Sequence, residues 1–529
     1  MKKRSVFTVC LALLITACLL VAVPPTLAAK SLKIGFMAPF TGPASRTGDQ
    51  FKRGIEMALE DAKEAGEIPV KVDGDTLDIE PMWVDSQSSP EKAVKAVTDA
   101  VNRGVKLMVT GWHSSVAMAC MDAESPLKIV HIGHQGESQY VNFKINDHPE
   151  KYQGWFKGWA SPPVFAGLYG PPLVHFMEKG LWKPANRKAA VIVEDTDFGR
   201  GWGEALVVSL RTAGFDVMPY DVTAIDETEF TPIITKYKAA KVSVVASTQT
   251  GGVPMYNFVK QVRAMGLKAL VLAHGLTWTG EWYQNTGESS DYAVCMDSPY
   301  PVSPEQKEWM KRFKDKYGID AGIAPCGQPY DHTRLAINAL NEAGTLKFET
   351  LVEHIRENVK YKGVWQMYDF ATYNDFWKDF SEEGTLHQLS RNDVRTGNFM
   401  EGFFFPLVQM FGGKPKILWP IDLAEAEEDF RAASMPGVEE RMERTALAAD
   451  YSKVAARCRA IFDAMQGAVL CDVEFSTGHR CWFDLRHRTP EMDDGFLPRG
   501  KEGDRIINLP SGETFVVPYE GEYEALPSW

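Results

Sequence analysis

Short apolar runs alternate with longer segments in which apolar residues recur every three or four positions, from Leu32 to about residue 273. The short runs predict buried strands and the longer segments predict amphipathic helices. The expected strands are residues 32–37, 77–84, 105–110, 128–132, 189–194, 242–247 and 269–273. Strands that alternate with helices in this way predict an α/β fold of doubly wound parallel sheets covered by helices.

Two of the helices carry especially clear signals. Apolar residues share one face of the first, namely Phe51, Ile55, Ala58, Leu59 and Ala62. In the second, Ser89 is expected to cap the helix and Pro90 to occupy its first turn. Its apolar stripe is expected to be Val94, Val97 and Val101.

Three stretches interrupt the alternation and predict crossings between two lobes. They are the aromatic and Gly/Pro-rich residues 142–169, the residues 298–301 and the polar residues 373–396. The expected lobes are residues 30–148 with 300–372 for lobe 1, and residues 149–299 with 373–420 for lobe 2. Several crossings predict a multi-strand hinge that is suited to closing.

The character of the chain changes after Pro420. Residues 422–450 are charged and predict a helical, linker-like segment, whereas residues 473–483 and 506–518 predict strands. We therefore expect residues 421–529 to form a separate, small α+β extension.

The start of the chain has the pattern of a secretory signal. Lys2, Lys3 and Arg4 precede an apolar run at residues 6–23, and small residues follow up to Ala29. This order predicts that residues 1–29 are a cleaved signal peptide and that the mature protein is periplasmic. Two alternatives remain open: an uncleaved membrane anchor, and lipidation at Cys18.

Charge and cysteine content narrow the classes of partner. The formal net charge is −13, and it is −16 without the three leader cations, from 54 basic and 70 acidic residues. An acidic chain is not expected to bind nucleic acid or anionic lipid. The six cysteines after the leader are scattered, which favours buried free thiols, with a Cys471–Cys481 bridge as the alternative.

One series of motifs resembles a known family. It begins with IGFMAPFTGP at residues 34–43 and EMAL at 56–59, and it continues with VDSQ at 84–87, TG at 110–111, EDTDFG at 194–199 and QVRAMG at 261–266. In this order, over residues 31–420, the motifs resemble the ABC-transporter periplasmic binding proteins for leucine, isoleucine and valine. The resemblance implies a type I periplasmic binding fold, capture of a small solute by lobe closure, and a permease and an ATPase as partners.

The resemblance also implies ligand-binding residues in the first lobe. Ser114 and Ser115 follow Gly111 at a predicted helix start, where the family's serine loop holds a carboxylate by backbone N–H groups, a hydroxyl and the helix dipole. The alternative is that Ser114 only caps its own helix. The next crevice loop places Gly133, His134 and Gln135 at matching positions, although the two larger side chains are alternatively ordinary surface residues.

In the second lobe, Phe198 stands where the family places an aromatic cover over the ligand, with packing against Trp202 as the alternative. Gln249 follows a predicted strand and is also expected in the site. His274 occupies the position of the acid that pairs with an amino acid's ammonium group in the family.

The histidine and its expected neighbours point to a different ligand chemistry. Trp112, His113, Trp278 and Tyr330 lie in the corresponding loops, and Thr47 replaces a family tyrosine in the first loop. These residues favour an organic acid, an amide or an aromatic carboxylate. The expected solute is therefore an amino-acid-like or aromatic carboxylate.

Motifs for catalysis and phosphate binding are missing: HExxH, GxSxG, a Walker loop and GxGxxG do not occur. No catalytic residue, metal ligand or cofactor is therefore predicted. The stretch NLPSGE at residues 508–513 resembles a bacterial metal-dependent aminopeptidase family, which implies a metal ligand at Glu513. That family's later ligands do not occur before Trp529, and one carboxylate does not make a catalytic metal site.

Two rival functions follow from these observations. One is an extracytoplasmic sensor with the same two lobes, which would signal to a receptor instead of a permease. The other is an exported metal-dependent peptidase that uses residues 421–529.

Overall fold

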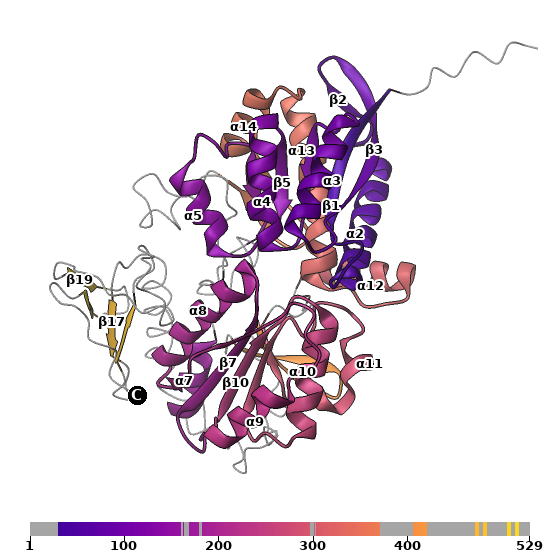
Figure 1. Ribbon diagram of the computed structural model, residues 1–529. Coiled ribbons are helices and arrows are strands. Elements are labelled where there is room, and N and C mark those ends of the chain that lie inside the picture. The colour runs from indigo at the N-terminus through magenta and orange to yellow at the C-terminus, as the bar shows by residue number, and fades with distance from the viewer. Residues whose placement is uncertain are drawn as a thin grey trace, which may run out of the picture.

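Two sheets covered by helices make up most of the computed structural model, one above the other in Figure 1. The structure describes residues 30–159, 169–178, 182–296, 303–370 and 406–419, with Pro162, Pro301 and four short strands between residues 471 and 517. Among these residues, no helix is both long and apolar enough to cross a membrane.

The first sheet has six strands in the order β2-β3-β1-β4-β5-β6. They are β1 (Ser31–Ala38), β2 (Val70–Val72), β3 (Asp75–Asp85), β4 (Leu107–Val109), β5 (Val130–His134) and β6 (Trp155–Lys157). Every pair is parallel except β2 with β3. All positions of β4 and β5 are buried, as expected for parallel strands covered on both faces.

Helices cover both faces of this sheet. They are α2 (Ser45–Glu64), α3 (Pro90–Asn102), α4 (Ser114–Glu124), α5 (Gln139–Asp147), α13 (Gln328–Ala343) and α14 (Phe348–Glu357). Leu107 and Val109 belong to the core that α2 and α13 share, whereas Met108 belongs to the core under α3 and α4. As predicted, Pro90 begins α3 and the Ser89 side chain accepts a hydrogen bond from Lys92.

The second sheet has eight strands, in the order β16-β15-β12-β11-β10-β7-β8 with β9 beside β7. They are β7 (Lys188–Glu194), β8 (Asp216–Val217), β9 (Asp221–Thr223), β10 (Val244–Thr248), β11 (Leu270–His274), β12 (Val294–Cys295), β15 (Leu407–Phe411) and β16 (Lys414–Trp419). Only the pairs of β12 with β15 and of β15 with β16 are antiparallel. The parallel, helix-covered sheets confirm the predicted α/β fold class.

The helices of the second lobe are α7 (Gly170–Glu178), α8 (Asp197–Thr212), α9 (Thr231–Ala240), α10 (Gly252–Ala264) and the short α11 (Trp282–Thr286). Alternate residues of β7 face opposite layers: Val191 packs in the core with Trp202 of α8, and Ile192 packs in the core with Phe258 of α10.

The chain passes between the lobes more than once. After β12 it forms α12 (Pro304–Tyr317), the π-helical turn Ile323–Gly327, α13, α14 and the hairpin β13 (Lys360–Lys362) with β14 (Met367–Asp369), before β15 joins the second sheet. The first sheet extends to Lys157, past the boundary expected after residue 148, because β6 pairs with β5.

The four strands of the extension form one small antiparallel sheet, in the order β18-β17-β20-β19. They are β17 (Cys471–Glu474), β18 (Arg480–Phe483), β19 (Arg505–Asn508) and β20 (Thr514–Val517). Glu513 and residues 422–450 lie outside the described residues, as do the side chains of Cys471 and Cys481. Cys120, Cys295 and Cys326 are buried free thiols, as expected.

Candidate functional site

A cavity lies between the two lobes, at the carboxyl ends of the strands of both sheets. Its lining comes from loops and helix starts that follow β4, β5, β7, β10 and β11, namely Trp112, His113, Gln135, Glu137, Phe198, Thr250 and Trp278. The carboxyl end of parallel strands is where open α/β sheets place their ligands. The geometry therefore singles out this cavity as the candidate site.

Aromatic rings from both lobes form much of the wall. The Trp112 and Trp278 rings meet edge to face with centroids 5.0 Å apart, and Phe198 lies 5.8 Å from Trp278. Behind them, His274 stacks on Trp202 at 3.8 Å. Closure thus brings apolar surface of both lobes together around the cavity.

Several buried polar atoms at this junction have no hydrogen-bond partner among the described residues. They are the Trp112 indole Nε1, both ring nitrogens of His113 and His274, and the side-chain amides of Gln135 and Gln249. Buried polar groups without partners are costly, so they point to a ligand or water that completes them. Burial lowers the pKa of His113 to about 3 and that of His274 well below its ordinary value, so both rings are neutral.

Glu137 is the acidic residue of the cavity wall. It lies in the loop between β5 and α5, is 4% exposed, and accepts hydrogen bonds from the indole nitrogens of Trp159, at 2.9 Å, and Trp202. Lys157 lies beside it and donates to the Glu137 backbone carbonyl at 2.8 Å. Burial raises the pKa of Glu137 to about 8, against the opposing effect of the two indoles and Lys157.

Glu194, at the end of β7, holds the second-lobe loops in place. Its carboxylate accepts from the Thr250 backbone N–H at 2.5 Å, from the Thr250 hydroxyl, and from the Thr196 hydroxyl at 2.8 Å. Thr196 in turn caps α8, which begins beside Phe198. One buried carboxylate therefore fixes both Thr250 and the start of α8.

Comparisons with known proteins decide the family. The family model described as periplasmic binding protein matches residues 31–378, which is more than half of the chain. The chain belongs to the periplasmic binding protein family. Membership implies an extracytoplasmic location, which is also what the pattern of residues 1–29 predicts.

One relative in sequence and two solved structures of the same fold are similar to this periplasmic binding protein. The Leu/Ile/Val-binding protein homolog 3 of Brucella melitensis is 25% identical over 324 residues, covering 58% of this chain and 82% of that protein. A putative branched-chain amino acid ABC transporter structure from Silicibacter pomeroyi has a TM-score of 0.61 at 17% identity, covering 75% of this chain and 98% of that one. A solute-binding protein of an R. palustris ABC transporter, in complex with benzoate, has a TM-score of 0.58 at 18% identity, covering 73% and 95%.

The cavity of this periplasmic binding protein brings together several of the residues that the sequence predicts. Trp112, Gln135 and Phe198 line it directly, and His274 lies 6.4 Å from Phe198 between ring centroids. Gln249 directly precedes the lining residue Thr250 and is fully buried. His113 and Trp278, expected nearby, are lining residues as well.

The two predicted serines make contacts within the protein. The Ser114 hydroxyl accepts a hydrogen bond from the Ser138 backbone at 3.0 Å, and the Ser115 hydroxyl accepts from the Asp197 backbone of the other lobe at 3.2 Å. His113 is the N-cap residue of α4 but makes no side-chain cap hydrogen bond. The first-turn N–H groups of α4, rather than the serine hydroxyls, are thus the donors that need an acceptor.

Gly133 and His134 lie behind the cavity wall. Gly133 has a φ of +79°, and a Cβ there would meet the His332 ring at 2.4 Å. His134 is fully buried, and its Nδ1 accepts from the Gly136 backbone at 2.9 Å. Both residues shape the crevice loop that carries Gln135 and Glu137.

Tyr330 is not brought to the cavity. It lies on α13 in a separate apolar cluster with Trp309 and Trp365, and its hydroxyl donates to Asp61 of α2 at 2.7 Å. Tyr330 was expected in the site because its chain position corresponds to a crevice loop of the family, and this prediction is wrong.

Two lining residues, Glu137 and Thr250, were not predicted from the sequence. Each follows a predicted strand by a few residues, which is the signal that could have found them. Within the described residues, no three His, Cys, Asp or Glu side chains gather in a way that could hold a metal ion. The arrangement offers reversible enclosure of a small solute, with aromatic contact, neutral hydrogen-bonding groups and one carboxylate.

Proposed function

We propose that this protein is the extracytoplasmic solute-binding subunit of an ABC importer, without catalytic activity, which captures a small amino-acid-like carboxylate between its lobes. The observation that carries the proposal is one cavity whose wall has aromatic rings from both lobes and buried polar groups of Trp112, His113 and Gln135 that have no partner among the described residues. Such groups need a hydrogen-bonding partner, which a solute in the closed site would supply.

The carboxylate end of the solute would lie at the start of α4. There the first-turn N–H groups lack intrahelical acceptors, the N-cap side chain of His113 makes no cap bond, and the helix dipole favours negative charge.

Closure would create the surface that a permease recognises. Contacts already join the lobes in the described structure, including Ser115 with Asp197, and the Tyr140 hydroxyl with Glu204 at 2.7 Å. A ligand that adds contacts to both lobes shifts the population toward the closed form.

A thermal-shift screen of the leaderless protein against amino acids, betaines, aliphatic acids, aromatic acids and amides tests the binding function. A solute at 100 times its Kd stabilises the native state by about 2.7 kcal/mol, which raises Tm by several degrees. The absence of a shift with every small solute would contradict the proposal.

The importer role needs a second test. A strain that lacks the gene should lose uptake of the radiolabelled solute, and the full-length protein should restore it. Normal uptake in that strain, together with a lost transcriptional or chemotactic response, would instead indicate a sensor.

A further inference from the structure

The cavity wall has one acidic side chain and no Lys or Arg among its seven lining residues. The acidic side chain is Glu137, and His113 is neutral. The nearest cation, Lys157, is fully buried behind the wall and donates to the Glu137 and Asn142 oxygens at 2.8 Å. Such a wall suits a positive group better than a negative one.

Three aromatic rings share this wall with Glu137. Trp112 comes from the first lobe, and Phe198 and Trp278 come from the second, so closure surrounds the cavity with rings from both sides. Aromatic faces attract cations through the ring quadrupole, and tryptophan does so most strongly. Desolvation in a buried site strengthens this attraction.

Hydrogen bonds hold Glu137 in place but leave part of the accepting capacity of its carboxylate free. Its two oxygens each accept one indole N–H, from Trp159 on one side and Trp202 on the other. An ionised carboxylate has about four acceptor positions, so capacity remains toward the cavity. An ammonium group in the cavity would also favour the ionised carboxylate against the effect of burial.

We propose that the cavity holds an alkylated ammonium group of the solute, enclosed by Trp112, Phe198 and Trp278, with Glu137 as its counter-charge. The inference rests on the proposed function and deepens it, since a carboxylate at α4 and a cation at Glu137 together describe a small betaine. Glu137 thereby supplies the acid that the position of His274 lacks.

The wall distinguishes an alkylated from a primary ammonium group. A primary ammonium has three N–H donors that need acceptors, whereas the rings offer none. Methyl groups on the nitrogen instead contact the rings and spread the charge over them. Selectivity should therefore increase with alkylation.

A matched pair of probes tests the inference. Glycine betaine and 3,3-dimethylbutanoate have the same shape and the same carboxylate, and differ by a positive nitrogen in place of a carbon. Isothermal titration of the leaderless protein should show glycine betaine binding at least tenfold tighter than 3,3-dimethylbutanoate, and tighter than glycine. Equal or weaker binding of glycine betaine would overturn the inference.

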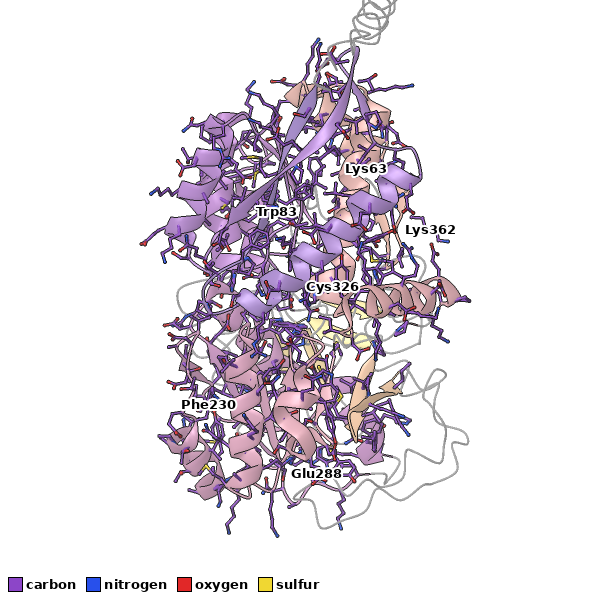
Figure 2. The ribbon with its side chains drawn as sticks, turned by 90° about the vertical axis from the view of Figure 1, so that its right-hand side faces the viewer. Lys63, Trp83, Phe230, Glu288, Cys326 and Lys362 are labelled. Atoms are coloured by element: carbon purple, nitrogen blue, oxygen red, sulfur yellow. The ribbon has the colours of Figure 1, made fainter. Side chains whose placement is uncertain are left out.

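Two variants locate the effect. Glu137→Gln should reduce the preference for glycine betaine over its carbon isostere at least tenfold, whereas Glu288→Gln, an exposed change at the far end of the second lobe, should leave it unchanged (Figure 2). If Glu137→Gln does not fold, Phe198→Leu serves, and it should weaken betaine binding more than binding of the isostere.

The remaining outcomes separate this inference from the proposed function. Tight binding of benzoate or leucine with no binding of glycine betaine would overturn the inference and leave the binding function standing. Binding of tetramethylammonium as tight as that of glycine betaine would support the cation site and contradict the carboxylate end. Binding of none of these probes would overturn the inference.

Discussion

The rings of Trp112 and Trp278 meet edge to face at 5.0 Å, one from each lobe, so closure of the protein can be followed through a single aromatic contact. Such a pair contributes about 0.5–1.5 kcal/mol beyond its buried area. The contact therefore helps to hold the lobes together even before a solute binds.

Trp112→Leu should shift the ligand-free protein toward the open form by about 2- to 12-fold, the loss expected for one aromatic pair. Small-angle scattering should show a larger radius of gyration than for the wild type. Trp83→Leu is the matched control, because Trp83 is 37% exposed on the first lobe (Figure 2). An unchanged radius in Trp112→Leu would show that the ring pair does not contribute to closure.

Closure should weaken as the pH rises. Burial against the other lobe raises the pKa of Glu204 to about 8, and its partners there are the Tyr140 hydroxyl and the Gln139 amide at 3.2 Å. The closed form therefore binds more protons than the open form between about pH 4.5 and 8, so its advantage is full at low pH and is lost across this window.

Scattering at pH 5 and pH 8.5 measures this effect. The ligand-free protein should be more open at pH 8.5. Glu204→Gln should make the difference between the two pH values smaller. Part of the difference should remain in this variant, because the pKa of Glu137 is raised in the same direction. Glu288→Gln should keep the wild-type difference. A pH response that Glu204→Gln leaves intact would contradict this assignment.

Glu194 is expected to act through Thr250 rather than on the solute. Glu194→Gln places an amide N–H₂ among the Thr250 N–H and hydroxyl donors, so one or two buried hydrogen bonds are lost, at about 1–3 kcal/mol. Affinity for the best solute of the screen should fall about tenfold, measured by titration, with a faster dissociation rate.

Unchanged affinity in Glu194→Gln, together with lower stability, would assign Glu194 a purely structural role. Glu288→Gln again provides the control, since it makes the same change of charge on an exposed residue of the same lobe.

The crevice loop needs glycine at position 133. Gly133→Ala should destabilise the protein more than Gly66→Ala, because both have a positive φ, +79° and +73°, but only a Cβ at 133 meets another side chain. The backbone strain is about 1–2 kcal/mol in both. The clash with His332 adds about 1–3 kcal/mol in Gly133→Ala.

Urea unfolding of the two glycine variants measures this difference. Equal loss of stability would mean that His332 moves aside without cost. Gly133→Ala should also weaken solute binding, since the same loop carries Gln135 and Glu137 into the cavity.

The strands and the two helices with the clearest signals were predicted well, because these signals are local in the sequence. The run at 128–132 and the Ser89-Pro90 helix start depend on neighbouring residues alone, and the structure has both. Trp112 and Phe198 were expected in the site because the resemblance to the family places them in crevice loops, and parallel strands bring such loops to one edge.

The features that were not predicted depend on packing between distant segments, which no local pattern reveals. Tyr330 faces Asp61 because α13 packs on α2, which the order of the motifs cannot indicate. Glu137 differs from other acidic residues because it accepts hydrogen bonds from Trp159 and Trp202, which reach it from different lobes. The strand Trp155–Lys157 was missed because three residues within an aromatic, Gly-rich stretch have no detectable period.

The pairing of β12 with β15 has a consequence for how the lobes can be separated. Val294 and Cys295 pair on one side with Gln409 and Val408, which follow the whole of α12–α14 along the chain. Each lobe is therefore assembled from stretches that are not adjacent in the chain, and one proteolytic cut at any crossing leaves the two lobes tied by the others. No uninterrupted stretch of the gene encodes a complete second lobe by itself, so its isolation requires a circularly permuted chain or a spliced one.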